Sequence, residues 1–193
     1  MSNIEKEWMK REQKLFSPAE LLGIMFEAMS SLPRMKKGKI SQTFKERLML
    51  AVTEVNGCPM CSYFHVEQAL KSGLNDEQIK KLLVGSLDHV PDEEVKALLF
   101  AQHYAEKRGK PDKGIYEGFK EDYKESHKEI MAAIRIIMFG NCLGIPFGSL
   151  KERLKGQKSD SRSNLAYELM VVFMFVFLTL PVFLLSIFAM PFK

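Results

Sequence analysis

The chain has 193 residues, of which 46% are hydrophobic and 27% are charged, so wholesale disorder is excluded and a folded core is expected. The net charge is only +4, and no stripe of Lys and Arg alternates with aromatic residues, which argues against nucleic-acid binding. Three cysteines do not make the disulfide framework of a small secreted protein.

Residues 1–16 form a charged N-terminal extension without the apolar stretch of a cleaved export signal. We therefore expect the bulk of the chain to lie in the cytosol, which is a reducing compartment. In that compartment a Cys-x-x-Cys pair more often serves catalysis or metal binding than structure.

Helical signals dominate residues 17–155, and no hairpin signal is found, so we predict an all-α domain of several helices. The first helix begins with a capping box, Ser17 to Glu20, with Pro18 at its first position. Further helices are expected to begin near residues 42, 59, 75, 91, 112 and 126. Gly140, Gly144 and Pro146 predict that the last of these ends near 139 and that a short helix follows to about 154.

The C-terminal region differs in composition. Residues 169–192 carry no charge over 24 positions, about 36 Å of helix, which is enough for one transmembrane helix. A buried core helix is the alternative. Residues 156–164 read as a polar linker and residues 165–193 as a tail anchor. Five Lys or Arg against two acidic residues in 151–164 predict that the domain faces the cytoplasm.

The stretch CPMCSYFH, residues 58–65, carries the clearest chemistry. Cys58, Cys61 and His65 are three and four residues apart, so one helix presents them on one face. The two thiols can form a disulfide across one turn, and the helix N-terminus favours a thiolate. His65 can accept a proton from Cys61. The pattern thus provides a nucleophile, a resolving thiol and a base.

Other interpretations of this stretch stay open. Free cysteines are common core residues, so the two thiols can be inert. A zinc site would require further ligands, and no second Cys-x-x-Cys or His-x-x-x-His occurs. A thioredoxin-like motif would require flanking strands. Cys142 is interpreted as a packing residue.

Glu46 lies on the preceding, mostly apolar helix. Buried there, it needs a partner, and an antiparallel helix pair would bring it to His65. The alternative is an exposed helix carboxylate.

The spacing from Glu46 to Cys58, Cys61 and His65 resembles the signature of the alkylhydroperoxidase D-like, carboxymuconolactone decarboxylase family. The similarity continues through FHVEQALKSGLNDEQIKKLL and through AAIRIIMFGNCLGIPFGSLKERL, residues 132–154. The resemblance implies an all-α domain in a homo-oligomer such as a trimer or hexamer. It also implies that Cys61 attacks a peroxide, that Cys58 resolves the product, and that Glu46 and His65 move protons.

The resemblance, together with the apolar stretch 169–192, leads us to expect a membrane-tethered thiol oxidoreductase that reduces hydroperoxides or disulfides without a cofactor or metal. A thioredoxin-like or lipoyl-bearing protein would supply electrons. Met60 stands where well-characterised peroxidases of the family carry a histidine, which puts peroxide turnover, but not thiol exchange, in question. The alternatives are a membrane-tethered scaffold or redox sensor, and non-redox decarboxylase-like chemistry.

Overall fold

The computed structural model describes residues 14–35 and 38–189, and every regular element in this part of the chain is a helix. The all-α fold class is therefore confirmed. The elements are α2 (Pro18–Ser31), the 3₁₀ helix η1 (Leu32–Arg34), α3 (Gln42–Asn56), α4 (Pro59–Lys71), α5 (Asp76–Leu83), α6 (Asp92–Glu106), α7 (Lys113–Asp122), α8 (His127–Leu154) and α9 (Leu165–Ala189).

Local sequence sets where these helices begin and end. Ser17 caps α2 in the predicted capping box, in which its backbone N–H donates to the Glu20 carboxylate at 2.8 Å. Ser41 caps α3, and Gly57 ends that helix in the left-handed conformation (φ 60°), which glycine adopts without strain. Pro91 stands directly before α6, as expected.

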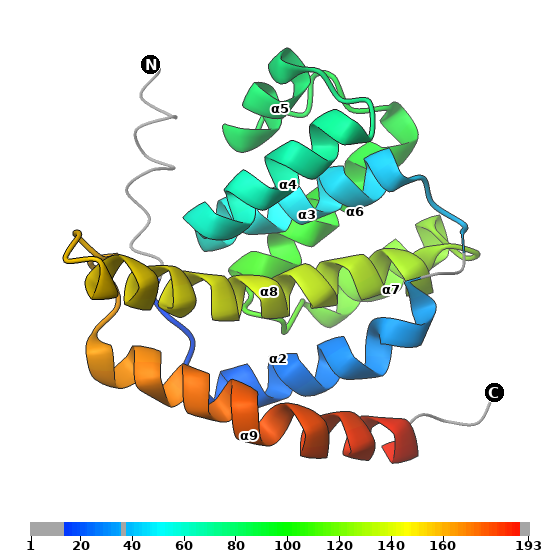
Figure 1. The fold of residues 1–193 in the computed structure, drawn as a ribbon. Coiled ribbons are helices and arrows are strands. Elements are labelled where there is room, and N and C mark those ends of the chain that lie inside the picture. Colours follow the sequence, from blue (N-terminus) through cyan, green and yellow to red (C-terminus); the bar gives the residue numbers. More distant parts are fainter. Residues whose placement is uncertain (1–13, 36–37, 190–193) are drawn as a thin grey trace.

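Helix α8 runs through the middle of the molecule (Figure 1). Helices α3 and α4 pack on one side of it, and α6 packs on α3. Helices α2 and α9 lie on the other side and also pack on each other. Because α8 is enclosed between these two layers, it carries much of the apolar core, including Ile130, Ile134 and Met138.

The predicted break between 139 and 147 is wrong. Helix α8 is continuous over 28 residues, with Pro146 inside it. A proline in a helix interior costs about 3 kcal/mol because its nitrogen cannot donate and its ring crowds the preceding turn. Burial of α8 between two helical layers offsets that cost, and Gly144 lets α8 approach a neighbour closely. Tertiary packing overrode the local signal.

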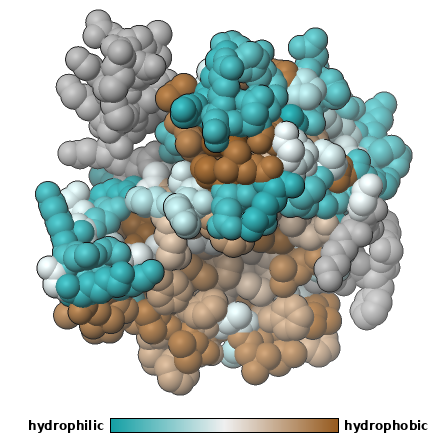
Figure 2. All heavy atoms as spheres, turned by 45° about the horizontal axis from the view of Figure 1, so that its top comes forward, coloured by the Kyte–Doolittle hydropathy of each residue, from teal (hydrophilic) through white to brown (hydrophobic). Residues whose placement is uncertain are grey.

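Two helices in the described residues are long and apolar enough to cross a membrane, judged by length and composition. In α8 the apolar window is 72% buried, so its hydrophobicity is accounted for by the core. In α9 the window is only 17% buried. Helix α9 is therefore not the buried core helix considered as the alternative, and it leaves a broad apolar surface on the molecule (Figure 2).

Helix α9 is nevertheless docked on the domain. Glu168, in its first turn, is completely buried and accepts two hydrogen bonds from the guanidinium of Arg153 on α8, at 3.0 and 3.1 Å. Val171 and Met174 are buried on the inner face of the helix. The Tyr167 hydroxyl donates to the carbonyl of Phe16 at 2.9 Å.

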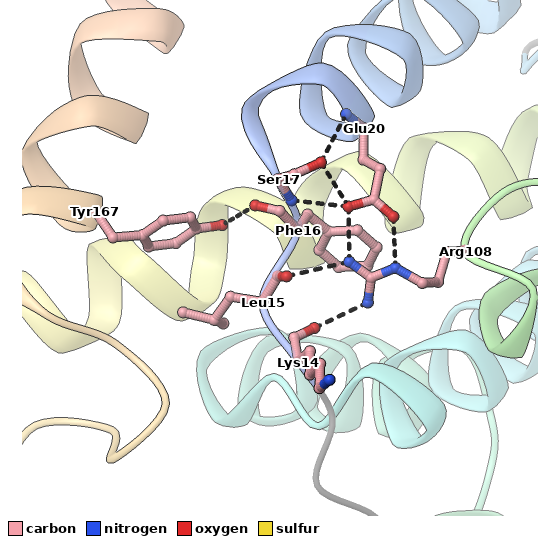
Figure 3. A network of polar contacts seen from close by, with 7 residues as sticks. All are labelled: Lys14, Leu15, Phe16, Ser17, Glu20, Arg108 and Tyr167. Atoms are coloured by element: carbon pink, nitrogen blue, oxygen red, sulfur yellow. Dashed lines mark hydrogen bonds and ion pairs between the residues drawn. The ribbon is translucent and has the colours of Figure 1, made fainter.

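The segment before α2 is held by Arg108 (Figure 3). Its guanidinium donates to both carboxylate oxygens of Glu20, at 2.6 and 2.9 Å, and to the carbonyls of Lys14 and Leu15. It also lies 4.3 Å from the centre of the Phe16 ring. A bidentate pair of this kind fixes orientation as well as charge. Arg108 thus joins the loop after α6 to the segment that Tyr167 also contacts.

Candidate dithiol active site

The two predicted thiols lie together at the start of α4. Cys58 is the N-cap residue, and its sulfur accepts the backbone N–H of Cys61 at 3.3 Å. Both cysteines are free, and their exposed fractions are 1% for Cys58 and 8% for Cys61. The left-handed turn at Gly57 and the fixed φ of Pro59 set this geometry, because they end one helix and begin the next within three residues.

Helix α8 packs directly on this pair through Gly144. An ideal Cβ placed on Gly144 would lie 2.5 Å from Cys61 Sγ and 2.6 Å from Cys58 Sγ, closer than real Cβ atoms approach. The Cys61 thiol donates to the carbonyl of Gly140, one turn earlier on α8, at 3.5 Å. Gly144 is therefore a residue of the site, and sequence reasoning treated it only as a helix breaker.

The surroundings shift the pKa values of the two thiols in opposite directions. The pKa of Cys58 is lowered, first by a hydrogen bond from the Cys61 thiol and further by backbone N–H groups and the charge of Arg162, against the effect of burial. The pKa of Cys61 is raised, first by its hydrogen bond with the Cys58 thiol and then by burial. The first proton is lost from the coupled pair, and the backbone N–H groups and Arg162 favour the charge on Cys58.

Glu46 and His65 form the pair that the sequence suggested. His65 Nδ1 lies 2.8 Å from Glu46 Oε2. Glu46 is only 2% exposed, so it is not a surface carboxylate, and its other oxygen accepts a hydrogen bond from Gln42 at 2.5 Å. A carboxylate on Nδ1 fixes the tautomer of a neutral imidazole and leaves Nε2 as the proton acceptor.

Arg162 belongs to the site but was not identified from sequence. It lies in the segment between α8 and α9, where the composition indicated only a polar linker. Its guanidinium donates to the carbonyls of Asn56 and Gly57, at 3.2 and 2.7 Å, immediately before Cys58. Asp160 holds it from the other side at 2.6 Å. Only the folded chain brings residue 162 to residue 57, so no local pattern reveals it.

A groove of about 520 Å³ opens beside the thiols. Its lining comes from α4, α8 and the segment 158–160. Met60 and Tyr63 are exposed on its α4 side, and Gly144 connects it to the two sulfurs. The buried Ser149 Oγ, which lines the groove, has no hydrogen-bond partner among the described residues. The groove is therefore large enough for a small organic molecule next to the pair, and neither sulfur lines it.

Other singled-out residues lie apart from this chemistry or support the fold. Cys142 on α8 is buried, and burial raises its pKa, so its thiol stays protonated. Arg135 on α8 pairs with Glu27 of α2 at 2.5 Å. In the described residues no three His, Cys, Asp or Glu side chains cluster in a way that could hold a metal ion.

The comparisons with known proteins agree with this picture. The sequence model of the carboxymuconolactone decarboxylase family matches residues 22–103, which include α3, α4 and the four predicted site residues. Comparisons with curated proteins and with solved structures return no match. Gly144 and Arg162 lie outside the matched segment. Residues 22–103 of this chain are thus similar to the carboxymuconolactone decarboxylase family.

Proposed function

We propose that this protein is a thiol-dependent oxidoreductase that reduces hydroperoxides or disulfides with the Cys58–Cys61 pair. The observation that carries the proposal is the juxtaposition of two free thiols at a helix N-terminus beside a groove, with one pKa lowered and the other raised.

The two thiols have different tasks in this mechanism. Cys61 is the more exposed of the two and attacks the substrate. Cys58 is the buried thiolate that then attacks the oxidised Cys61. A thiol of low pKa is also the better leaving group, so an external reductant that attacks Cys61 expels Cys58. The difference in pKa between the two thiols therefore assists both the oxidation of the pair by the substrate and its later reduction by the external reductant.

Glu46 and His65 supply the base that Cys61 requires. The raised pKa of Cys61 means that its proton must be removed for attack. His65 lies one helical turn beyond Cys61, and its Nδ1–H is held by Glu46. We expect Nε2 to receive the thiol proton and later return it to the leaving oxygen or sulfur.

The proposed steps balance as follows for a hydroperoxide. The Cys61 sulfur attacks one peroxide oxygen, the O–O bond breaks, and an alcohol leaves with a proton. This converts Cys61 to a sulfenic acid. Cys58 attacks that sulfur, water leaves, and the Cys58–Cys61 disulfide forms. A dithiol reductant, for which thioredoxin-like and lipoyl-bearing proteins are candidates, restores both thiols and becomes a disulfide.

The test is reductant-dependent turnover by the full chain in detergent. Cumene hydroperoxide and a small disulfide are offered separately with excess dithiothreitol. We expect consumption that disappears in Cys58→Ser and in Cys61→Ser but persists in Cys142→Ser. Peptide mapping after mild oxidation should find Cys58 joined to Cys61 and Cys142 free. Turnover of neither substrate above that of the two Ser variants would refute the proposal.

We also propose that α9 attaches the protein to a membrane. The support is its apolar outer surface, which includes Phe173, Val176, Phe177, Leu180 and Phe188. A soluble protein rarely exposes so many large apolar side chains of one helix to water. The exposed lysines Lys151, Lys155 and Lys158 lie before the helix and favour a cytoplasmic domain.

A further inference from the structure

The segment between α8 and α9 contributes a fixed positive charge to the start of α4. Arg162 uses Nη1 and Nη2 to reach the carbonyls of Asn56 and Gly57 and uses Nε and Nη2 to reach Asp160. The guanidinium thus closes the C-terminal end of α3, where free carbonyls favour a cation. Gly57, which the guanidinium binds, directly precedes Cys58, the N-cap of the next helix.

We propose that Arg162 is a positioning residue that holds the α3–α4 turn and favours the thiolate of Cys58. The proposal rests on the dithiol function above and adds a residue beyond the family segment to it. Arginine suits this place because its planar fork reaches two carbonyls and a carboxylate at once. Lysine, a single ammonium group, would keep the charge but lose the fork.

The charged and titratable groups that bear on the two thiols come from three elements. They are the thiols themselves on α4, Cys142 on α8, and Arg162 on the linker with its partner Asp160. Cys142 is a neutral thiol at ordinary pH because burial raises its pKa. The hydrogen bond from the Cys61 thiol is the first cause that lowers the pKa of Cys58, and the positive charge of Arg162, partly offset by Asp160, adds to it.

The experiment measures the pH dependence of Cys58 alkylation by iodoacetamide, read by peptide mass spectrometry. The parent is full-length Cys61→Ser, which keeps a hydroxyl donor beside Cys58. Arg162→Gln, Arg162→Lys and Lys155→Gln are added to it singly. Lys155→Gln is the matched control, because it removes one positive charge from the same segment at an exposed position that does not line the groove. Midpoints are compared instead of absolute rates, since a lost side chain can also change access.

We expect Arg162→Gln to move the midpoint to higher pH and to lower the thiolate fraction at pH 7 about three- to tenfold. Arg162→Lys should lie between Gln and the parent, and Lys155→Gln should match the parent. A residue that only held the linker would change the melting temperature and leave the midpoint in place. If Arg162→Gln does not fold, Arg162→Lys decides, because an unmoved midpoint in the folded Arg162 variants overturns the proposal.

This readout is independent of turnover. A wild-type protein that turns over neither substrate, with a midpoint that still responds to Arg162, would refute the proposed function and support the role of Arg162. Normal turnover with a midpoint that does not change in the Arg162 variants would support the proposed function and refute the role of Arg162.

Discussion

Glu46 is a buried carboxylate in a helix whose other side chains are mostly apolar or paired. Burial of an ionised group without partners costs several kcal/mol, so its two contacts, with His65 and Gln42, are requirements of the fold as well as features of the site. The same contacts orient the imidazole. Stability and proton transfer therefore depend on the same two bonds.

We predict that His65→Gln and Glu46→Gln each lower turnover by roughly 10²–10⁴-fold, the usual contribution of a general base. The double variant should lose far less than the sum of the two losses in free energy, because the residues act as one unit. Steady-state kinetics at several pH values measures this. Glu67→Gln, on the exposed side of α4, is the matched control. Strictly additive losses would mean that the two residues act separately.

Two glycines on helix α8, Gly144 and Gly148, have different surroundings at the site. Gly148 lies one turn after Gly144, and the nearest atom to its ideal Cβ is Met60 Cβ at 3.9 Å, an ordinary contact. At Gly144 the same Cβ would meet both sulfurs. Two glycines of one helix therefore differ in what they permit.

We predict opposite effects for the two alanine substitutions. Gly148→Ala should stabilise the protein by up to about 1 kcal/mol through helix propensity. Gly144→Ala should destabilise it by about 1–3 kcal/mol, because the thiols or α8 must shift. It should also change the rate of Cys61 alkylation. Urea unfolding and alkylation kinetics measure both effects. Equal stabilisation by the two substitutions would show that the contact at Gly144 is not tight.

At the scale of the whole molecule, polar contacts join segments that are distant in sequence. Arg108 joins the loop after α6 to Glu20 on α2, and Tyr167 joins α9 to the same region (Figure 3). The hydrogen bond from Arg108 holds the pKa of Glu20 at about 2, below the ordinary value of 4.5.

We predict an acid-dependent loss of stability from Glu20. Because the pKa is lower in the folded than in the unfolded state, the contribution is complete above about pH 4.5 and is lost as the pH falls toward 2. Its size is about 1 kcal/mol, because solvent screens the partly exposed Glu20–Arg108 pair. Urea unfolding at pH 5 and pH 3 should show a smaller fall for Glu20→Gln than for wild type. Parallel falls in both proteins would contradict the assignment.

We predict that the full-length protein pellets with membranes and resists alkaline extraction. Val176→Lys with Leu180→Lys should release it, since both exposed side chains belong to the apolar outer surface and each lysine there opposes contact with the apolar part of a bilayer. Leu99→Lys, at an exposed position on α6, is the control. Wild type that stays in the alkaline supernatant would contradict attachment through α9. Protection of the domain from protease added on the cytoplasmic side would contradict the orientation.

The sequence by itself determined the helix boundaries set by caps and the grouping of Cys58, Cys61 and His65. These features depend on contacts between residues a few positions apart, so the local pattern contains them. It also pointed to Glu46, because an acid in an apolar helix needs a partner and a short turn brings the next helix to it.

Only the tertiary structure decided the rest. Helix α8 continues through Pro146 because burial between two layers outweighs a local cost. Gly144 faces the sulfurs and Arg162 reaches Gly57 through contacts that join residues about 80 to 105 positions apart, and no local periodicity encodes such contacts. For the same reason the sequence described 169–192 as an apolar span, whereas packing of the whole chain determined that α9 lies along α2 and α8.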